Sequence, residues 1–146
     1  MTNQEYNVLV KSKSPNSKLG VNMLKAFLIG GLICAFGQVL LLLYSSAGAE
    51  EKTASTLVSV TLIFLSVVLT GLGLYYKIAK HGGAGTLVPI TGFANAVASP
   101  AIEYKSEGQI LGVGAKMFTI AGPVIVFGVM ASVLYGVILW VWQMLV

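Results

Sequence analysis

The chain has 146 residues, of which 56% are hydrophobic and 10% charged, and its mean hydropathy is +0.86. This composition excludes a soluble globular domain and indicates a membrane protein with room for one domain. Nine lysines and five acidic residues give a net charge of +4. The lysines flank apolar blocks one or two at a time, so they indicate topology and exclude a nucleic-acid-binding stripe.

Residues that could carry chemistry are few. The single cysteine, Cys34, lies inside an apolar block, so an intrachain disulfide is impossible. The sequence contains no Cys/His cluster with metal-ligand spacing, no nucleophile elbow and no phosphate-binding loop. We therefore expect no catalytic residue, no metal and no cofactor, and a protein that is not an enzyme.

Residues 1–23 are polar and show no periodic apolar pattern, which predicts a short, mostly disordered cytoplasmic tail. Residues 24–146 are expected to form a single membrane domain. From Leu24 to Tyr44 the chain is apolar for about 20 residues, enough at about 1.5 Å per residue to cross roughly 30 Å of hydrocarbon. A cleaved signal peptide is the alternative, because Ala47, Gly48 and Ala49 follow, although the apolar run is unusually long for one.

Two further spans are expected. The second, Thr56–Tyr76, follows a polar turn and is closed by two lysines and a histidine. The third runs from about Met117 to Trp140, after a glycine-rich segment, with tryptophans at the membrane interface. The predicted fold class is an all-α integral membrane protein with three long transmembrane helices plus a broken or re-entrant helical segment over residues 84–108.

The lysines favour a segment 84–108 that enters the membrane and returns to the same side. In that case Lys52 is the one lysine outside, whereas a crossing segment would also place Lys105 and Lys116 outside. Cytoplasmic loops carry the positive excess, so the N-terminus is predicted to be cytoplasmic and the C-terminus to lie on the opposite side.

An internal repeat places residues 25–44 over residues 116–135 in constant register. The coinciding pairs are Lys25/Lys116, Phe27/Phe118, Ile29/Ile120, Gly31/Gly122, Phe36/Phe127, Gly37/Gly128, Leu43/Leu134 and Tyr44/Tyr135. With a re-entrant segment between them, one crossing separates the copies and the repeat is parallel. The alternative is that both segments are spans built from common membrane residues.

Polar residues in segment 84–108 recur every four positions, which places them on one face of a helix. They are Thr91, Asn95, Ser99, Glu103 and Glu107. In lipid such a face is tolerated against protein or water, so we expect it to line a solute pathway. An amphipathic helix lying on the membrane surface is the alternative. Pro100 either kinks the helix or begins a second one capped by Ser99.

Two further sets of residues are candidates for a role in conduction. Lys25 and Lys116 share a register and are expected to form an anion-attracting mouth, with snorkelling anchors as the alternative. The candidate hinge or gating residues are Gly82, Gly83, Gly85, Pro89, Gly122 and Pro123. Small residues at spacing four, Gly128, Ser132 and Gly136, favour self-association or a partner subunit.

Three blocks, "KAFLIGGLICAFGQ", "VPITGFANAVASPAIEYKSEGQILGVG" and "VIVFG", resemble the SpoVA membrane proteins of endospore-forming bacteria. The resemblance covers residues 24 to about 138, and "TGFANAV" with "EYKSEG" is its most specific part. It implies residence in the inner membrane of the forespore and spore, among membrane lipid and other SpoVA subunits.

The resemblance also implies a function. SpoVA proteins act in moving a small anionic solute, dipicolinic acid as its calcium chelate, into the forespore and out at germination. The expectation is therefore a subunit of a homo- or hetero-oligomeric channel. The alternative is a non-conducting membrane scaffold that recruits other SpoVA or germination proteins. Nothing in the sequence suggests a nucleic-acid partner.

Overall fold

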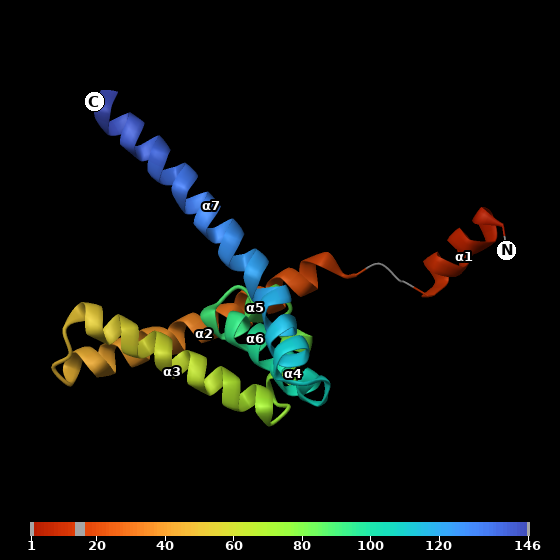
Figure 1. Cartoon of the computed structure of the whole chain (residues 1–146), viewed down its shortest axis with the longest axis horizontal. Coiled ribbons are helices and arrows are strands. Elements are labelled where there is room, and N and C mark those ends of the chain that lie inside the picture. Colours follow the sequence, from red (N-terminus) through yellow and green to blue (C-terminus); the bar gives the residue numbers. More distant parts are fainter. Residues whose placement is uncertain (1, 14–16, 146) are drawn as a thin grey trace.

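The computed structural model describes residues 2–13 and 17–145, and these residues are helical with no strand among them. The elements in chain order are α1 (Asn3–Lys13), α2 (Leu19–Ser46), α3 (Glu51–Gly71), α4 (Tyr75–Gly82), α5 (Ala84–Leu87), α6 (Ile90–Glu103), the 3₁₀ helix η1 (Tyr104–Glu107), the π-helix η2 (Gln109–Gly114) and α7 (Ala115–Leu145) (Figure 1). Three stretches are long and apolar enough to cross a membrane, 19–46, 51–71 and 109–145. The predicted fold class is confirmed.

Helices α2 and α3 form an antiparallel hairpin around a turn at Gly48, whose φ of 91° favours glycine (Figure 1). A Cβ at Gly37 would lie 3.5 Å from Leu62, which is an ordinary contact distance and shows that the two helices touch at this position. The hydroxyls of Tyr44 and Thr61 are 2.8 Å apart. Small residues and interhelical hydrogen bonds are what hold helices together in lipid, where hydrophobic burial gives no advantage.

The second span ends earlier than predicted. Helix α3 stops at Gly71, and Gly73, with a φ of 67°, separates it from α4. The predicted boundary at Tyr76 is therefore wrong, because the apolar pattern continues across a break that a left-handed glycine makes. The lysines and histidine expected to close this span lie on α4 instead.

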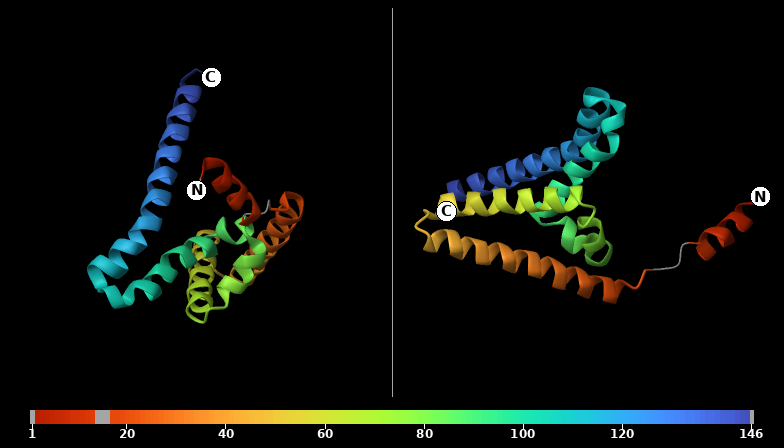
Figure 2. Two further views of the ribbon diagram at one scale, coloured as in Figure 1. Left: turned by 90° about the vertical axis from the view of Figure 1, so that its right-hand side faces the viewer. Right: turned by 90° about the horizontal axis from the view of Figure 1, so that it is seen from below.

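The short helices α4, α5 and α6 lie at the end of the hairpin opposite its turn (Figure 2). Gly83, with a φ of 48°, separates α4 from α5, and Pro89 directly precedes α6, so the chain is broken where the sequence predicts. Helices α4 and α5 pack on α2, whereas α6 packs on α3 and α7. Helix α6 continues through the buried Pro100, so the alternative of a second helix beginning at Ser99 is wrong.

The tail is more ordered than predicted. Residues 3–13 form α1, and its start is a capping box that the sequence interpretation missed. The Thr2 amide donates to Glu5 Oε2 at 2.8 Å, and the Glu5 amide donates to Thr2 Oγ1 at 3.4 Å. The following α2 begins at Leu19, within the predicted tail. Residues 14–16 of that tail lie outside the described residues.

Helix α7 runs in the same general direction as α2 and opposite to α3 (Figures 1 and 2). It begins after the π-helix, extends beyond the predicted limits of 117 and 140, and is continuous through Pro123. Ala121 is its one buried residue, and every residue from Pro123 to Leu145 is exposed. Most of α7 therefore lies outside the packed part of the chain.

Candidate functional site

The start of α6 is held by hydroxyl groups from α3. Ser66 and Thr70 lie four residues apart and so occupy one face of α3. Ser66 Oγ donates to the Thr91 carbonyl oxygen at 2.6 Å, and Thr70 Oγ1 lies 2.9 Å from Asn95 Oδ1. The same Thr70 oxygen is 2.7 Å from the Ser66 carbonyl oxygen, so one proton is shared between two acceptors. Two hydrogen bonds, one helical turn apart, thus join α3 to α6.

Tyr75 of α4 extends this network toward α5. Its hydroxyl donates to the Thr86 carbonyl oxygen at 2.8 Å and lies 3.3 Å from Thr91 Oγ1. Ser66, Thr86 and Thr91 are only 1%, 2% and 7% exposed. No buried side-chain polar atom of the described residues lacks a partner. Because unpaired polar groups are costly in hydrocarbon, this network defines where α6 sits against the hairpin.

The predicted polar face of α6 divides into two parts. The Asn95 side chain bonds to α3, and the Thr91 hydroxyl bonds to Tyr75 of α4, so both polar groups are used in helix packing. Ser99 is half-buried, and Glu103 and Glu107 are exposed near the end of α6 and in η1. These last three side chains make no hydrogen bond or ion pair within residues 2–13 and 17–145. Lining of a solute pathway by the five residues stays a prediction.

Four residues of this network were not singled out in the sequence. They are Ser66, Thr70, Tyr75 and Thr86, which lie in predominantly apolar stretches where no polar pattern marks them. The available signal was the four-residue spacing of Ser66 and Thr70, repeated by Thr91 and Asn95. Without the tertiary structure, nothing indicates that the two pairs face one another.

The candidate hinge glycines have different surroundings. Gly85 packs so tightly on the backbone of Ala26 that a methyl group there would overlap it, and one at Gly82 would lie 2.9 Å from Ile29. Gly83 provides the left-handed turn between α4 and α5. Gly122 has open space around it. Gating by these glycines and by Pro89 and Pro123 stays a prediction.

The two lysines of the repeat also differ. Lys116 Nζ lies 4.4 Å from the centroid of the Tyr104 ring, a cation–π contact that joins α7 to η1. Lys25 is exposed. A common anion-attracting mouth formed by Lys25 and Lys116 stays a prediction.

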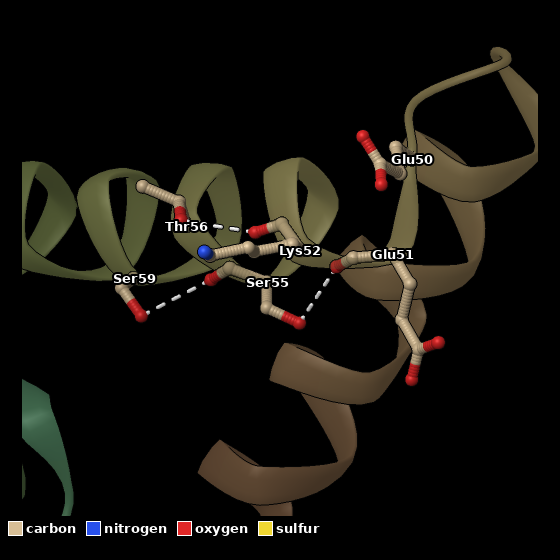
Figure 3. Close-up of a pocket in the computed structure, with 6 residues that line it drawn as sticks. All are labelled: Glu50, Glu51, Lys52, Ser55, Thr56 and Ser59. Atoms are coloured by element: carbon tan, nitrogen blue, oxygen red, sulfur yellow. Dashed lines mark hydrogen bonds between the residues drawn. The ribbon is translucent and has the colours of Figure 1, made fainter.

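A polar cavity of about 550 Å³ lies at the turn of the hairpin, beside Glu50, Glu51 and Lys52 (Figure 3). Its Ser55 hydroxyl donates to the Glu51 carbonyl oxygen at 2.9 Å, so it is engaged within α3. The hydroxyls of the cavity's other Ser and Thr residues are likewise bonded within the helix. The described residues contain no group of three or more His, Cys, Asp or Glu that could hold a metal.

The same blocks of sequence match known proteins. The model of the SpoVAC/SpoVAEB family of sporulation membrane proteins matches residues 22–138, from the start of α2 through most of α7. The chain belongs to the SpoVAC/SpoVAEB family. The expected resemblance is thereby confirmed, and the chain is a sporulation membrane protein with several apolar helices.

A curated relative agrees with the family assignment. Stage V sporulation protein AC of Bacillus subtilis (strain 168) is 50% identical over 141 residues, which cover 94% of each chain. No solved structure matches the chain. The matched region of the SpoVAC/SpoVAEB family contains all of the hydrogen-bond network and leaves α1 outside it.

Proposed function

We propose that this SpoVAC/SpoVAEB protein is a subunit of a channel in the inner membrane of the forespore and spore. The channel conducts dipicolinic acid, largely as its calcium chelate, into the forespore during sporulation and out of the spore at germination. Conduction is passive or gated and requires no catalytic step. The N-terminus lies on the spore-core side. This orientation places the lysines on the cytoplasmic face of the membrane, where positive residues are enriched.

The division of the polar face of α6 carries this proposal. Thr91 and Asn95 anchor α6 to the hairpin, which leaves Ser99, Glu103 and Glu107 without partners in the described chain. In a membrane, polar groups without protein partners are placed toward water. These three residues therefore line the pathway in the assembled channel, with Lys25 and Lys116 around its mouth attracting the anion.

The working form is an oligomer of this chain, of sister SpoVA subunits or of both. Helix α7 is exposed from Pro123 to Leu145, and three spans are few for an independent pathway. A methyl group at Gly128 or Gly136 would have no neighbour within 4 Å, so both sites are open to close approach by another helix.

Release from liposomes tests the channel. The full chain, reconstituted alone or with its sister subunits, is expected to release entrapped calcium dipicolinate, with and without applied membrane tension. Glu103→Gln and Glu107→Gln should change the release rate while the amount of assembled protein stays constant. Glu50→Gln, an exposed carboxylate at the other end of the hairpin, is the matched control. Absence of release in every combination would count against the channel.

A membrane scaffold is the second candidate, and α1 favours it. This helix lies apart from the membrane-spanning helices (Figure 1), with Tyr6 58% exposed and Val10 39% exposed. An amphiphilic helix on the aqueous side is suited to recruiting a soluble partner. Deleting residues 2–13 separates the candidates: a scaffold loses its partners, whereas a channel retains its solute release.

A further inference from the structure

A cleft of about 410 Å³ lies between the first turns of α2 and the loop that joins α4 to α5. Helix α2 contributes Asn22, Met23 and Ala26, and the other wall contributes Lys80, His81 and Ala84. The walls are held together next to the cleft by the contact of Gly85 with the Ala26 backbone. The cleft is therefore part of the packed structure.

The polar rim of the cleft is cationic and has no acidic residue. Its charged side chain is Lys80, and His81 adds an imidazole. His81 Nδ1 lies 2.9 Å from the Lys77 carbonyl oxygen. A carbonyl oxygen only accepts, so this contact assigns the proton to Nδ1 and uses the ring's N–H within α4. Asn22 adds a carboxamide that can donate on the opposite side.

The floor of the cleft is apolar. Met23, Ala26 and Ala84 line it. The cleft lies where α2 passes from the polar tail into its apolar run, which is the level of lipid headgroups. A ligand that fits has an anionic group for the rim and an apolar part that continues into the bilayer.

We propose that this cleft binds the headgroup of an anionic phospholipid, with the phosphate between Lys80 and Asn22 and the glycerol backbone against the apolar floor. Basic clefts between membrane helices are suited to such headgroups, and each nearby lysine strengthens binding by about fivefold. A bound headgroup bridges α2 to α4 and supports the contact between Ala26 and Gly85. This site is independent of the proposed channel.

Lipid retention by the full chain tests the site. The protein in detergent is mixed with phosphatidylglycerol or with phosphatidylcholine of the same acyl chains, and native mass spectrometry counts the bound lipid. Phosphatidylglycerol should bind more tightly, and Lys80→Gln should weaken its binding about fivefold. Lys80→Arg should preserve binding, because the charge remains. Lys52→Gln, at the turn of the hairpin and distant from the cleft, is the control and should change nothing.

Soluble anions distinguish the source of the phosphate. Inorganic phosphate and glycerol phosphate, which lack acyl chains, should not displace phosphatidylglycerol. Displacement by either would overturn the lipid assignment, since the cleft would then be a site for a free anion. Equal binding of the two lipids, or equal effects of Lys80→Gln and Lys52→Gln, would also overturn it. Circular dichroism of each variant checks that the helices are intact.

Discussion

The two copies of the internal repeat meet the short helices at corresponding positions. In α2, Ala26 and Gly30 approach Gly85 of α5. In α7, the counterparts are Met117, which lines an apolar groove with α6, and Ala121, the buried residue of that helix. The first turns of both copies thus pack against the short helices, α2 against α5 and α7 against α6.

Their outer halves differ. In α2, Gly37 lies against α3 and the Tyr44 hydroxyl contacts Thr61. The counterparts in α7 are Gly128, which has nothing within 4 Å, and Tyr135, which is 63% exposed. The same residue types therefore form a helix contact in one copy and leave an open surface in the other. Within the described chain, the outer half of α7 lacks the partner that α3 provides to α2, which supports the proposed oligomer.

The largest expected effect is at the shared inner contact. Gly85→Ala forces a methyl group into the Ala26 backbone and should destabilise the protein by about 3 kcal/mol. Unfolding in mixed detergent measures this free energy. Gly31→Ala is the control, because a methyl group there meets nothing within 4 Å. Equal stability of the two variants would show that α5 does not pack on α2 in this way.

The outer glycines provide a sharper test of the difference. Gly37→Val should cost about 1–2 kcal/mol of stability, because its added methyl groups overpack Leu62. Gly128→Val should leave the stability of the single chain unchanged and weaken the oligomer. Unfolding free energy and cross-linking in membranes measure the two effects. An oligomer insensitive to Gly128→Val would exclude this face of α7 as the interface.

The two tyrosines should show a smaller difference. Tyr44→Phe removes the hydrogen bond to Thr61 and should reduce stability by about 0.6 kcal/mol, the average for such bonds in membranes. Tyr135→Phe should have no effect on the isolated chain, since its hydroxyl has no partner among the described residues. Paired unfolding curves measure both. If Tyr135→Phe were the more destabilising change, the assigned difference between the copies would be reversed.

The lysines should show the smallest difference. Lys116→Gln removes the cation–π contact with Tyr104 and should cost about 0.5 kcal/mol, whereas Lys25→Gln should cost nothing measurable. Tyr104→Leu should have the same effect as Lys116→Gln, and combining the two should add nothing further. Additive losses in that double-mutant cycle would mean that the two side chains do not interact.

Local patterns predicted much of the fold. Apolar length identified three spans, and Gly83 and Pro89 marked the breaks, because these residues restrict the backbone locally. The second span was placed too far along the chain, since apolar residues continue past Gly73. The helical tail was missed, although Thr2 and Glu5 carry its capping box. In both cases one or two residues, Gly73 or the pair Thr2 and Glu5, set the helix boundary within a longer pattern that obscured them.

The candidate site was predicted less completely. The four-residue spacing found Thr91, Asn95 and Ser99 on one face, but spacing alone does not say what that face meets. Ser66, Thr70 and Tyr75 were overlooked because a hydroxyl in a transmembrane run can bond to its own helix, as Thr119 and Ser132 do here. Hydrogen bonds between helices depend on their relative placement.

The amino-acid pattern is sufficient to identify an all-helical membrane protein with a broken segment after its second span. Hydrophobic length, glycine and proline act within a few residues, so these features need no tertiary contact. Three features depend on the tertiary structure: Asn95 bonds to α3, Gly85 packs on Ala26, and α7 from Pro123 onward contacts no other helix of the described chain. Such contacts join residues distant in the chain, so two segments that share eight of twenty residues can meet different neighbours.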